Sequence, residues 1–398
     1  MRNAEYKMVP DIQGEPEIVS EVSSLQELLD RVSGRIYQIE QPQEDAGLAD
    51  QAPFPFLAIV GQKEMKLALL LSLVNPNMGG VLLIGPRGTG KTTAIRGLVD
   101  LLPHVKRSLC YYGCLEEDIE ASGINAVCPN CAQKYGQGDP LTELKEVRLV
   151  ELPLNARLED VVGGLDPRAE VNERMRLKRG ILSHADRNLL YVDEVNMLSD
   201  EVVDAILDAA AQGQFTVRRG AMSATYRSDF ALIGSMNPEE GHLRPQIMDR
   251  FGLRVIVRGL ETKPERLEAY RRTHAFKVSP RSFVEQLTGD TQALREEIQV
   301  SRDVLGEVKL PEEVAKTGLE LIEKLKIDSL RAEITLFEAA RAYAAADARL
   351  EVNFQDLRTV APLALRLRRS QFMTDYLNDQ QDECEELSAI VNEITPAG

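Results

Sequence analysis

Residues 81–92 read VLLIGPRGTGKT, an apolar run followed by a glycine-rich loop that ends in Lys-Thr. The spacing G-x-x-x-x-G-K-[ST] is typical of a phosphate-binding loop, in which backbone N–H groups surround the phosphates of a nucleotide. The apolar run predicts a buried strand, and Lys91–Leu102 has the pattern of a helix stopped by Pro103. Because the loop lies between a strand and a helix, we favour phosphate binding over an ordinary glycine turn.

The residues of this loop have separate expected roles. Lys91 would reach the β and γ phosphates of ATP, and Thr92 would bind the accompanying Mg²⁺. The glycines let the backbone approach the anion and adopt positive φ where needed. We expect the nucleotide to contact Gly85, Pro86, Arg87, Gly88, Thr89, Gly90, Lys91 and Thr92.

A second apolar run, LLYV at 189–192, ends in the two carboxylates Asp193 and Glu194. If this strand lies beside the phosphate loop, Asp193 would hold the Mg²⁺ shell. Glu194 would then orient and deprotonate the attacking water. The alternative is a buried strand followed by a solvated acidic turn, and the phosphate loop favours the catalytic interpretation.

Polar residues further along the chain complete the predicted nucleotide site. Asn237 follows another apolar run, where a carboxamide could position the water or the γ phosphate, although Asn before Pro also starts turns. Two arginines, Arg244 and Arg250, follow Asn237 in the chain and are candidates for contacts with the γ phosphate. An arginine from a neighbouring chain supplies positive charge to the γ phosphate in many NTPases, and surface ion pairing is the alternative for both residues.

Composition restricts the class of protein. The chain has 398 residues and a formal net charge of −16, which disfavours nucleic-acid binding because phosphates are neutralised by clustered Lys and Arg. The longest apolar run, Leu67–Val74, is too short to cross a bilayer. The N-terminus has acidic residues and no apolar stretch, so we expect neither a secretory signal nor a transit peptide, and a cytoplasmic location.

The pattern along the chain predicts three regions. Residues 1–52 read as an acidic tail with one short helix, and residues 53–262 alternate strands and helices. This alternation predicts an α/β fold, a three-layer α/β/α P-loop core around a parallel sheet. From residue 263 to 398 a linker and helices dominate. Predicted strands of the core include 146–151, 188–192 and 230–234, with a hairpin over Phe215–Arg218 and Ser223–Arg227.

Two local clusters stand out from this pattern. Four of the five cysteines form two close pairs within an insert at 110–131, which suits a structural Zn²⁺ ion bound by Cys110, Cys114, Cys128 and Cys131. Redox-active dithiols, an iron–sulfur cluster and unliganded thiols are the alternatives. The basic cluster Leu365–Arg369 is interpreted as a solvated helix face, with a docking surface for an acidic partner as the alternative.

Longer motifs resemble one family in particular. PFLAIVGQKEMKLALLL, GPRGTGKTTAIRGL, LPLNARLEDVVGGLD, LLYVDEVNML, GSMNPEEGHLRPQIMDRFGL and SLRAEITL are together similar to the AAA+ I subunit of magnesium chelatase, from about residue 53 to the end. The resemblance implies Walker A at Lys91 and Thr92 and Walker B at Asp193 and Glu194. It further implies roles for Asn237 (sensor 1), Arg250 (arginine finger), Arg244 (second interfacial arginine) and Arg331 (lid sensor 2).

The resemblance also implies a function and partners. Members form ATP-dependent rings, hexameric in the family, with a D subunit and a porphyrin-binding H subunit. ATP and Mg²⁺ are the implied ligands, and the coupled reaction places Mg²⁺ in protoporphyrin IX for chlorophyll or bacteriochlorophyll biosynthesis. The rival functions are a motor for another tetrapyrrole chelatase, an AAA+ protein that remodels a different complex, and a DNA-processing AAA+ protein. The N-terminal extension and the four cysteines depart from the family pattern.

Overall fold

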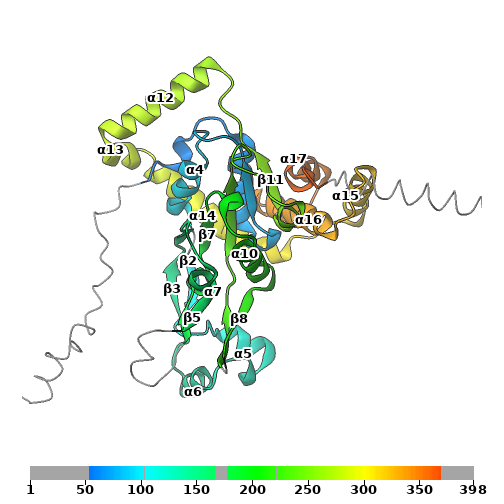
Figure 1. Cartoon of the computed structure of the whole chain (residues 1–398). Helices are drawn as coiled ribbons and strands as arrows, with labels where there is room; N and C mark the ends of the chain where they lie inside the picture. The colour runs from blue at the N-terminus through cyan, green and yellow to red at the C-terminus, as the bar shows by residue number, and fades with distance from the viewer. Residues whose placement is uncertain (1–52, 103, 166–176, 221, 369–398) are drawn as a thin grey trace, which may run out of the picture. The chain divides into compact units, whose positions relative to one another are not determined.

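The computed structural model describes residues 53–102, 104–165, 177–220 and 222–368 (Figure 1). These residues belong to one compact unit, Pro53–Gly398. The expected N-terminal tail over 1–52 and its short helix lie outside the described residues. None of the helices in the described part of the chain is long and apolar enough to cross a membrane.

A parallel five-stranded sheet carries the fold (Figure 1). All four residues of β1 and all four of β7 are buried, as a strand covered on both faces requires. The strand order is β11-β1-β10-β7-β4, and every neighbouring pair is parallel. The strands are β1 (Val81–Ile84), β4 (Leu149–Leu152), β7 (Leu189–Val192), β10 (Ala231–Met236) and β11 (Leu253–Ile256).

Helices cover both faces of this sheet. Successive strand residues point to opposite faces, so Leu83 joins one hydrophobic cluster with Ile95, while Leu82 joins a second cluster with Ile206. The predicted three-layer α/β/α fold is therefore confirmed. The helices of this region are α3 (Lys63–Val74), α4 (Lys91–Gly97), α7 (Leu158–Val162), α9 (Ile181–His184), α10 (Asp200–Gln212) and α11 (Pro245–Arg250).

The region after the sheet is helical, as predicted. Helix α16 packs against α17 and also against α3. Leu336 of α16 therefore belongs to the same hydrophobic cluster as Leu69 of α3. The helices are α12 (Lys263–Val278), α13 (Pro280–Glu285), α14 (Thr288–Val304), α15 (Glu312–Lys324), α16 (Leu330–Ala346) and α17 (Phe354–Leu365).

One predicted strand needs correction, and one strand of the sheet was not predicted. The expected strand 146–151 is divided, because Glu146 ends β3 (Thr142–Glu146), which pairs with β2 (His104–Ser108) outside the main sheet, whereas β4 begins at Leu149. The edge strand β11 was absent from the expected strands because Arg254 interrupts its apolar pattern. The predicted hairpin is confirmed as β8 (Gln214–Arg219) and β9 (Met222–Arg227), and β5 (Gly163–Leu165) pairs with β6 (Leu177–Arg179).

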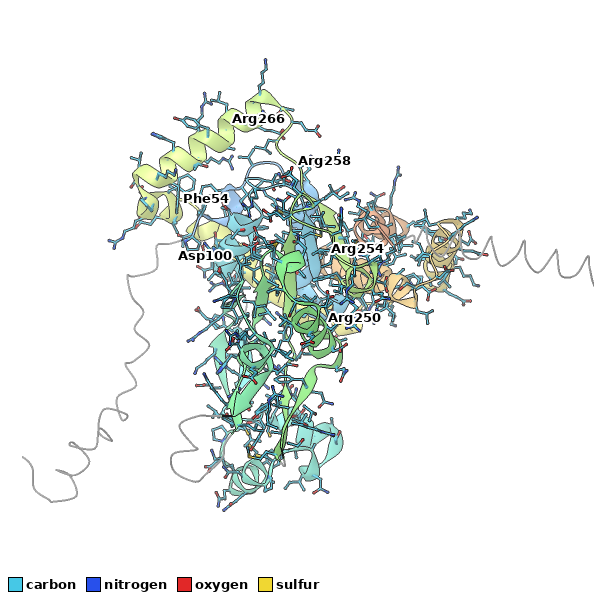
Figure 2. The ribbon with its side chains drawn as sticks, in the orientation of Figure 1. Phe54, Asp100, Arg250, Arg254, Arg258 and Arg266 are labelled. Atoms are coloured by element: carbon cyan, nitrogen blue, oxygen red, sulfur yellow. The ribbon has the colours of Figure 1, made fainter. Side chains whose placement is uncertain are left out.

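Asp249, in the last turn of α11, connects the sheet to the C-terminal helices. It accepts a hydrogen bond from Arg368 at 2.9 Å. It also lies 3.5 Å from Arg254, which is labelled in Figure 2. Both guanidinium side chains are almost fully buried, with 0% and 1% exposed. The interpretation of Leu365–Arg369 as a solvated helix face is therefore wrong for Arg368, which also donates to backbone carbonyls of the core; Arg369 lies outside the described residues.

We predict that Asp249→Ala destabilises the fold. Burial raises the pKa of Asp249, but a hydrogen bond from Ser329 and the charges of Arg368 and Arg254 more than offset it, so the pKa lies below its usual value. The substitution leaves two buried cations without this carboxylate and should cost about 2–3 kcal/mol in urea unfolding at neutral pH. Because the pKa of Asp249 is lower in the folded chain than in the unfolded chain, Asp249 stabilises the fold fully only above its unfolded-state pKa. The difference in free energy of unfolding between the variant and the unmodified chain should therefore shrink as the pH falls through the folded-state pKa of Asp249.

The exposed Asp347 supplies the control. It pairs with Arg349 at 2.9 Å, and Asp347→Ala should cost less than about 1 kcal/mol because solvent screens the pair. Equal losses for the two substitutions would contradict the role given to Asp249.

Candidate nucleotide site

Parallel pairing brings the predicted site residues to one edge of the sheet. Ile84, the last residue of β1, lies opposite Met236, the last residue of β10. In turn, Gly234 of β10 lies opposite Val192, the last residue of β7. The phosphate loop, the two carboxylates after β7 and Asn237 after β10 therefore leave the sheet at the same edge, the place where ligands bind in open α/β sheets.

The phosphate loop has the backbone that its glycines predict. Gly88 and Gly90 adopt φ values of 79° and 86°, in the left-handed region that other residues rarely adopt. A Cβ on Gly85 would lie 2.2 Å from the carbonyl oxygen of Val257, so only glycine fits between β1 and β11 here. Thr89 donates a hydrogen bond to the Pro86 carbonyl at 3.0 Å, which closes the loop on itself.

Lys91 is buried, and its ammonium group points back into this loop. It donates to the carbonyl oxygens of Gly85 at 2.6 Å and Pro86 at 2.9 Å. Burial lowers the pKa of Lys91, and the nearby carboxylates of Asp193 and Glu194 oppose that shift. The cation is thus held by weak neutral acceptors that phosphate oxygens, as charged acceptors, can replace.

A chain of hydroxyl groups joins the phosphate loop to the acidic end of β7. Thr92 Oγ1 lies 3.2 Å from the Tyr191 hydroxyl, which lies 3.3 Å from Ser235 Oγ. Ser235 in turn donates a hydrogen bond to the Asp193 carboxylate. These contacts bring Thr92 and Asp193, the two expected Mg²⁺ ligands, into one network.

Sequence reasoning missed Tyr191 and Ser235 as members of this network. Burial of the Tyr191 phenol raises its pKa, so it stays protonated and serves as a fixed hydrogen-bonding group. The available signal was a polar residue inside each of two apolar strands, two positions before Asp193 in one and two positions before Asn237 in the other. A sequence without the strand pairing does not say that these two side chains meet.

Glu194 has an unusual backbone and a cationic partner. Its φ is 47°, in the left-handed region where a residue with a side chain is strained, as is common at functional sites. Its carboxylate accepts a hydrogen bond from Arg87 at 3.1 Å, and Arg87 also pairs with Glu240. The side chain of Arg87 is 71% exposed, so this loop residue bridges the two carboxylates at the surface of the site.

Asn237 is buried directly after β10. Its side-chain oxygen accepts a hydrogen bond from the backbone N–H of Glu239 at 3.3 Å, and its carbonyl accepts one from Asn196 at 3.3 Å. The first bond orients the carboxamide. Next to it, Gly85 donates its N–H to the Met236 carbonyl at 3.1 Å, so Asn237 follows the residue that contacts the start of the phosphate loop.

The three predicted arginines contact carboxylates away from the Walker residues. Arg250, labelled in Figure 2, lies 2.8 Å from Asp208 on α10. Arg244 lies 2.9 Å from Asp200 on the same helix. Arg331 lies 3.4 Å from Asp249. These are the ion pairs of a single chain, and the finger and sensor roles of the three arginines remain predictions.

A cavity of about 610 Å³ opens near the same edge of the sheet. Its walls come from the N-terminal end of α3 and from the segment that follows β11, and they include Gly61, Gln62, Ile256, Arg258 and Leu260. Val257, within this segment, contacts Gly85 at the start of the phosphate loop. A flat organic group attached to the phosphates could therefore occupy the cavity.

Comparisons with known proteins support the family resemblance and the fold. A family model described as magnesium chelatase, subunit ChlI, matches residues 167–249, and one described as an AAA lid domain matches residues 316–390. A solved structure from Cytophaga hutchinsonii is 21% identical, covers 79% of this chain and 84% of its own, and has a TM-score of 0.50, which supports the fold.

Two relatives match across nearly all of their length. The magnesium-chelatase subunit ChlI homolog of Methanocaldococcus jannaschii is 39% identical over 345 residues, 86% of this chain and 91% of the relative. The magnesium-chelatase 38 kDa subunit of Acidiphilium rubrum is 42% identical over 319 residues, 80% of this chain and 91% of the relative. This chain therefore belongs to the family of magnesium chelatase ChlI subunits.

Proposed function

We propose that this chain is the ATP-hydrolysing AAA+ motor subunit of magnesium chelatase, which couples ATP hydrolysis to insertion of Mg²⁺ into protoporphyrin IX. The observation that carries the proposal is the hydroxyl network from Thr92 to Asp193 beside the phosphate loop. It joins Thr92 and Asp193, the two proposed Mg²⁺ ligands, beside the phosphate loop of a chain that belongs to the magnesium chelatase ChlI family.

ATP and Mg²⁺ are the proposed ligands of this site. Mg²⁺ would neutralise charge on the β and γ phosphate oxygens, held by Thr92 and Asp193. Lys91 would exchange its two carbonyl partners for phosphate oxygens, because an anion is the stronger acceptor. The cavity beside the phosphate loop would take the nucleotide base.

Glu194 is the proposed general base. Glu194 is paired with Arg87, so its carboxylate must part from that guanidinium before it can contact and deprotonate the attacking water. The exposed Arg87 can turn toward the triphosphate, which offers a competing negative charge. Asn237 would hold the water or the γ phosphate from the neighbouring strand end.

The proposed site is completed by a second copy of the chain. Arg250 of the neighbour would contact the γ phosphate as the arginine finger, with Arg244 at the same interface. Arg331 would sense the nucleotide from the lid helix α16. Asp249 contacts Arg331 of α16 and directly precedes Arg250 in the chain. A movement of α16 would therefore displace Arg250.

The assembly proposed for the chain is a homo-oligomeric ring, a hexamer by family resemblance. A D-type subunit and a porphyrin-binding H-type subunit are its proposed partners, and the cytoplasm its proposed location. ATP hydrolysis would break the contacts that the residues of the site make with the γ phosphate. The resulting change in the arrangement of the lid relative to the core would act on these partners.

Two substitutions separate binding from hydrolysis. Lys91→Ala should weaken nucleotide binding by about tenfold or more, because the buried cation is lost. Glu194→Gln should bind ATP normally and lower kcat by about 100-fold or more, because the amide cannot accept the proton of water. Fluorescent-nucleotide titration and phosphate release would measure the two effects, with the exposed Glu313→Gln as an unaffected control. Normal hydrolysis by Glu194→Gln would refute its assignment as the base.

Mixed rings test whether Arg250 acts across the subunit interface. Arg250→Ala and Glu194→Gln should each lower hydrolysis in pure rings by about 100-fold or more, and an equal mixture should regain about a quarter of normal activity. Only sites with an intact base and an intact neighbouring finger would work, and random mixing gives that combination at one interface in about four.

A matched arginine substitution controls this experiment. Arg358 is exposed on α17, and Arg358→Ala should retain full activity in pure rings. If mixing the first two variants restores no hydrolysis, although mixed rings form, Arg250 does not serve a neighbouring site.

Reconstitution tests the function as a whole. The purified chain, combined with D and H subunits of a related chelatase, ATP and Mg²⁺, should convert protoporphyrin IX to its magnesium form, followed by absorbance. Omission of the chain, or use of Glu194→Gln, should remove the product. If the chain hydrolyses ATP and binds the D subunit but no porphyrin is metallated, a motor for another tetrapyrrole chelatase or complex becomes the better assignment.

A further inference from the structure

The insert between β2 and β3 has very little apolar core of its own. Helix α5 (Glu116–Ser122) buries none of its residues, and α6 (Pro129–Gln137) buries only Cys131. The insert's small hydrophobic cluster consists of Cys114, Val127, Cys131 and Leu141. Units of this size rarely fold on burial alone and commonly depend on disulfides or a bound metal.

The four cysteine sulfurs of the insert converge on one point. The sulfurs of Cys110, Cys114, Cys128 and Cys131 all lie within 4.8 Å of one another. Four thiolates around one Zn²⁺ ion at about 2.3 Å lie roughly 3.8 Å apart, and Cys110 Sγ and Cys128 Sγ are separated by 3.6 Å.

The same geometry disfavours the other chemistries open to four cysteines. All four thiols are free, and their sulfurs form one group of four instead of two bonded pairs. An iron–sulfur cluster would place its own iron and sulfide atoms between the thiolates and so needs wider spacing. A single small tetrahedral cation fits the observed separation.

Backbone N–H groups donate to two of the four sulfurs. The N–H of Tyr112 donates to Cys110 Sγ at 3.4 Å, and the N–H of Cys128 donates to Cys114 Sγ at 3.3 Å. Such N–H···S bonds orient metal-bound thiolates and tune their charge. Cys128 also caps α6, and Cys131 lies in its first turn, so both sulfurs lie near the positive end of a helix.

The loop between the first two cysteines rests on the β8–β9 hairpin. The ring of Tyr112 stacks on that of Tyr226, with centroids 5.8 Å apart, and the Tyr112 carbonyl accepts a hydrogen bond from the Arg227 N–H at 3.3 Å. Arg227 also pairs with Asp118 of α5. Gly113 is required here, because a Cβ on it would lie 2.7 Å from Arg227.

We propose that Cys110, Cys114, Cys128 and Cys131 bind one Zn²⁺ ion, and that this ion holds the insert against the β8–β9 hairpin, Gln214–Arg227. The ion has a structural role: four thiolates leave no open position for a substrate. This inference is independent of the nucleotide site, because none of its contacts involves the Walker residues.

Metal analysis of the purified full-length chain tests the site directly. The unmodified chain and the control Cys384→Ser, which changes the fifth cysteine, should contain about one zinc per chain. The double variant Cys128→Ser/Cys131→Ser should contain essentially none. Iron in place of zinc, disulfides detected by mass spectrometry, or four freely titrating thiols without metal in the unmodified chain would overturn the proposal.

Metal exchange keeps the test valid if the double variant does not fold. Replacement of zinc by Co²⁺ in the unmodified chain should produce the visible absorption and thiolate charge-transfer bands of a tetrahedral cobalt–thiolate site. Zinc should then displace cobalt and bleach these bands. A cobalt spectrum typical of six-coordinate oxygen ligands would contradict a four-thiolate site.

Hydrogen exchange tests the link to the hairpin. Amide exchange over residues 214–227 should become about tenfold faster or more in the zinc-free double variant, because the support of the hairpin is lost. Arg227→Ala should accelerate the same amides while keeping its zinc, since it breaks the contact and not the metal site. Unchanged hairpin exchange in a folded, zinc-free chain would overturn the supporting role, and basal ATP hydrolysis should persist in both variants.

Discussion

The parallel pairing of β1 with β10, and of β10 with β7, is the constraint on which the nucleotide site depends. Each strand leads directly into part of the site, and the register brings Tyr191 and Ser235, near the ends of β7 and β10, together with the segments that follow β1, β7 and β10. A slip of one residue in either pairing would move Ser235 to the opposite face and break the hydroxyl network to Asp193. β1 and β7 are buried on both faces, so these pairings lie in the interior of the protein.

A second constraint acts through charge. Arg254 and Arg368 are buried, and buried cations require a nearby anion or carbonyl groups. Asp249 supplies that anion to both, and it also contacts Arg331 of the lid helix. The segment that carries Arg250 is thereby tied to the sheet edge and to the C-terminal helices at once. A movement of α16, which carries Arg331, would therefore act on the segment that carries Arg250.

The two extensions from the core form a structural unit of their own. The β2–β3 insert and the β8–β9 hairpin begin far apart in the sequence, yet Tyr112 stacks on Tyr226 and Asp118 pairs with Arg227. With so few buried apolar residues, the insert depends on cross-linking by its cysteines for a defined shape. The hairpin in turn is supported by the insert through these contacts.

The sequence alone determined the local motifs: the phosphate loop, the carboxylates after β7 and the cysteine spacing. Each of them lies in a short continuous segment, so the local sequence pattern was sufficient to predict it. It also predicted the layered fold, because alternation of apolar strands and helices is itself local. Only the tertiary structure decided that Tyr191 and Ser235 bridge Thr92 to Asp193, that β11 is a strand despite Arg254, and that Arg368 is buried. Each of these depends on contacts between residues distant in the chain, and a buried charge cannot be told from a solvated one until its partner is in place.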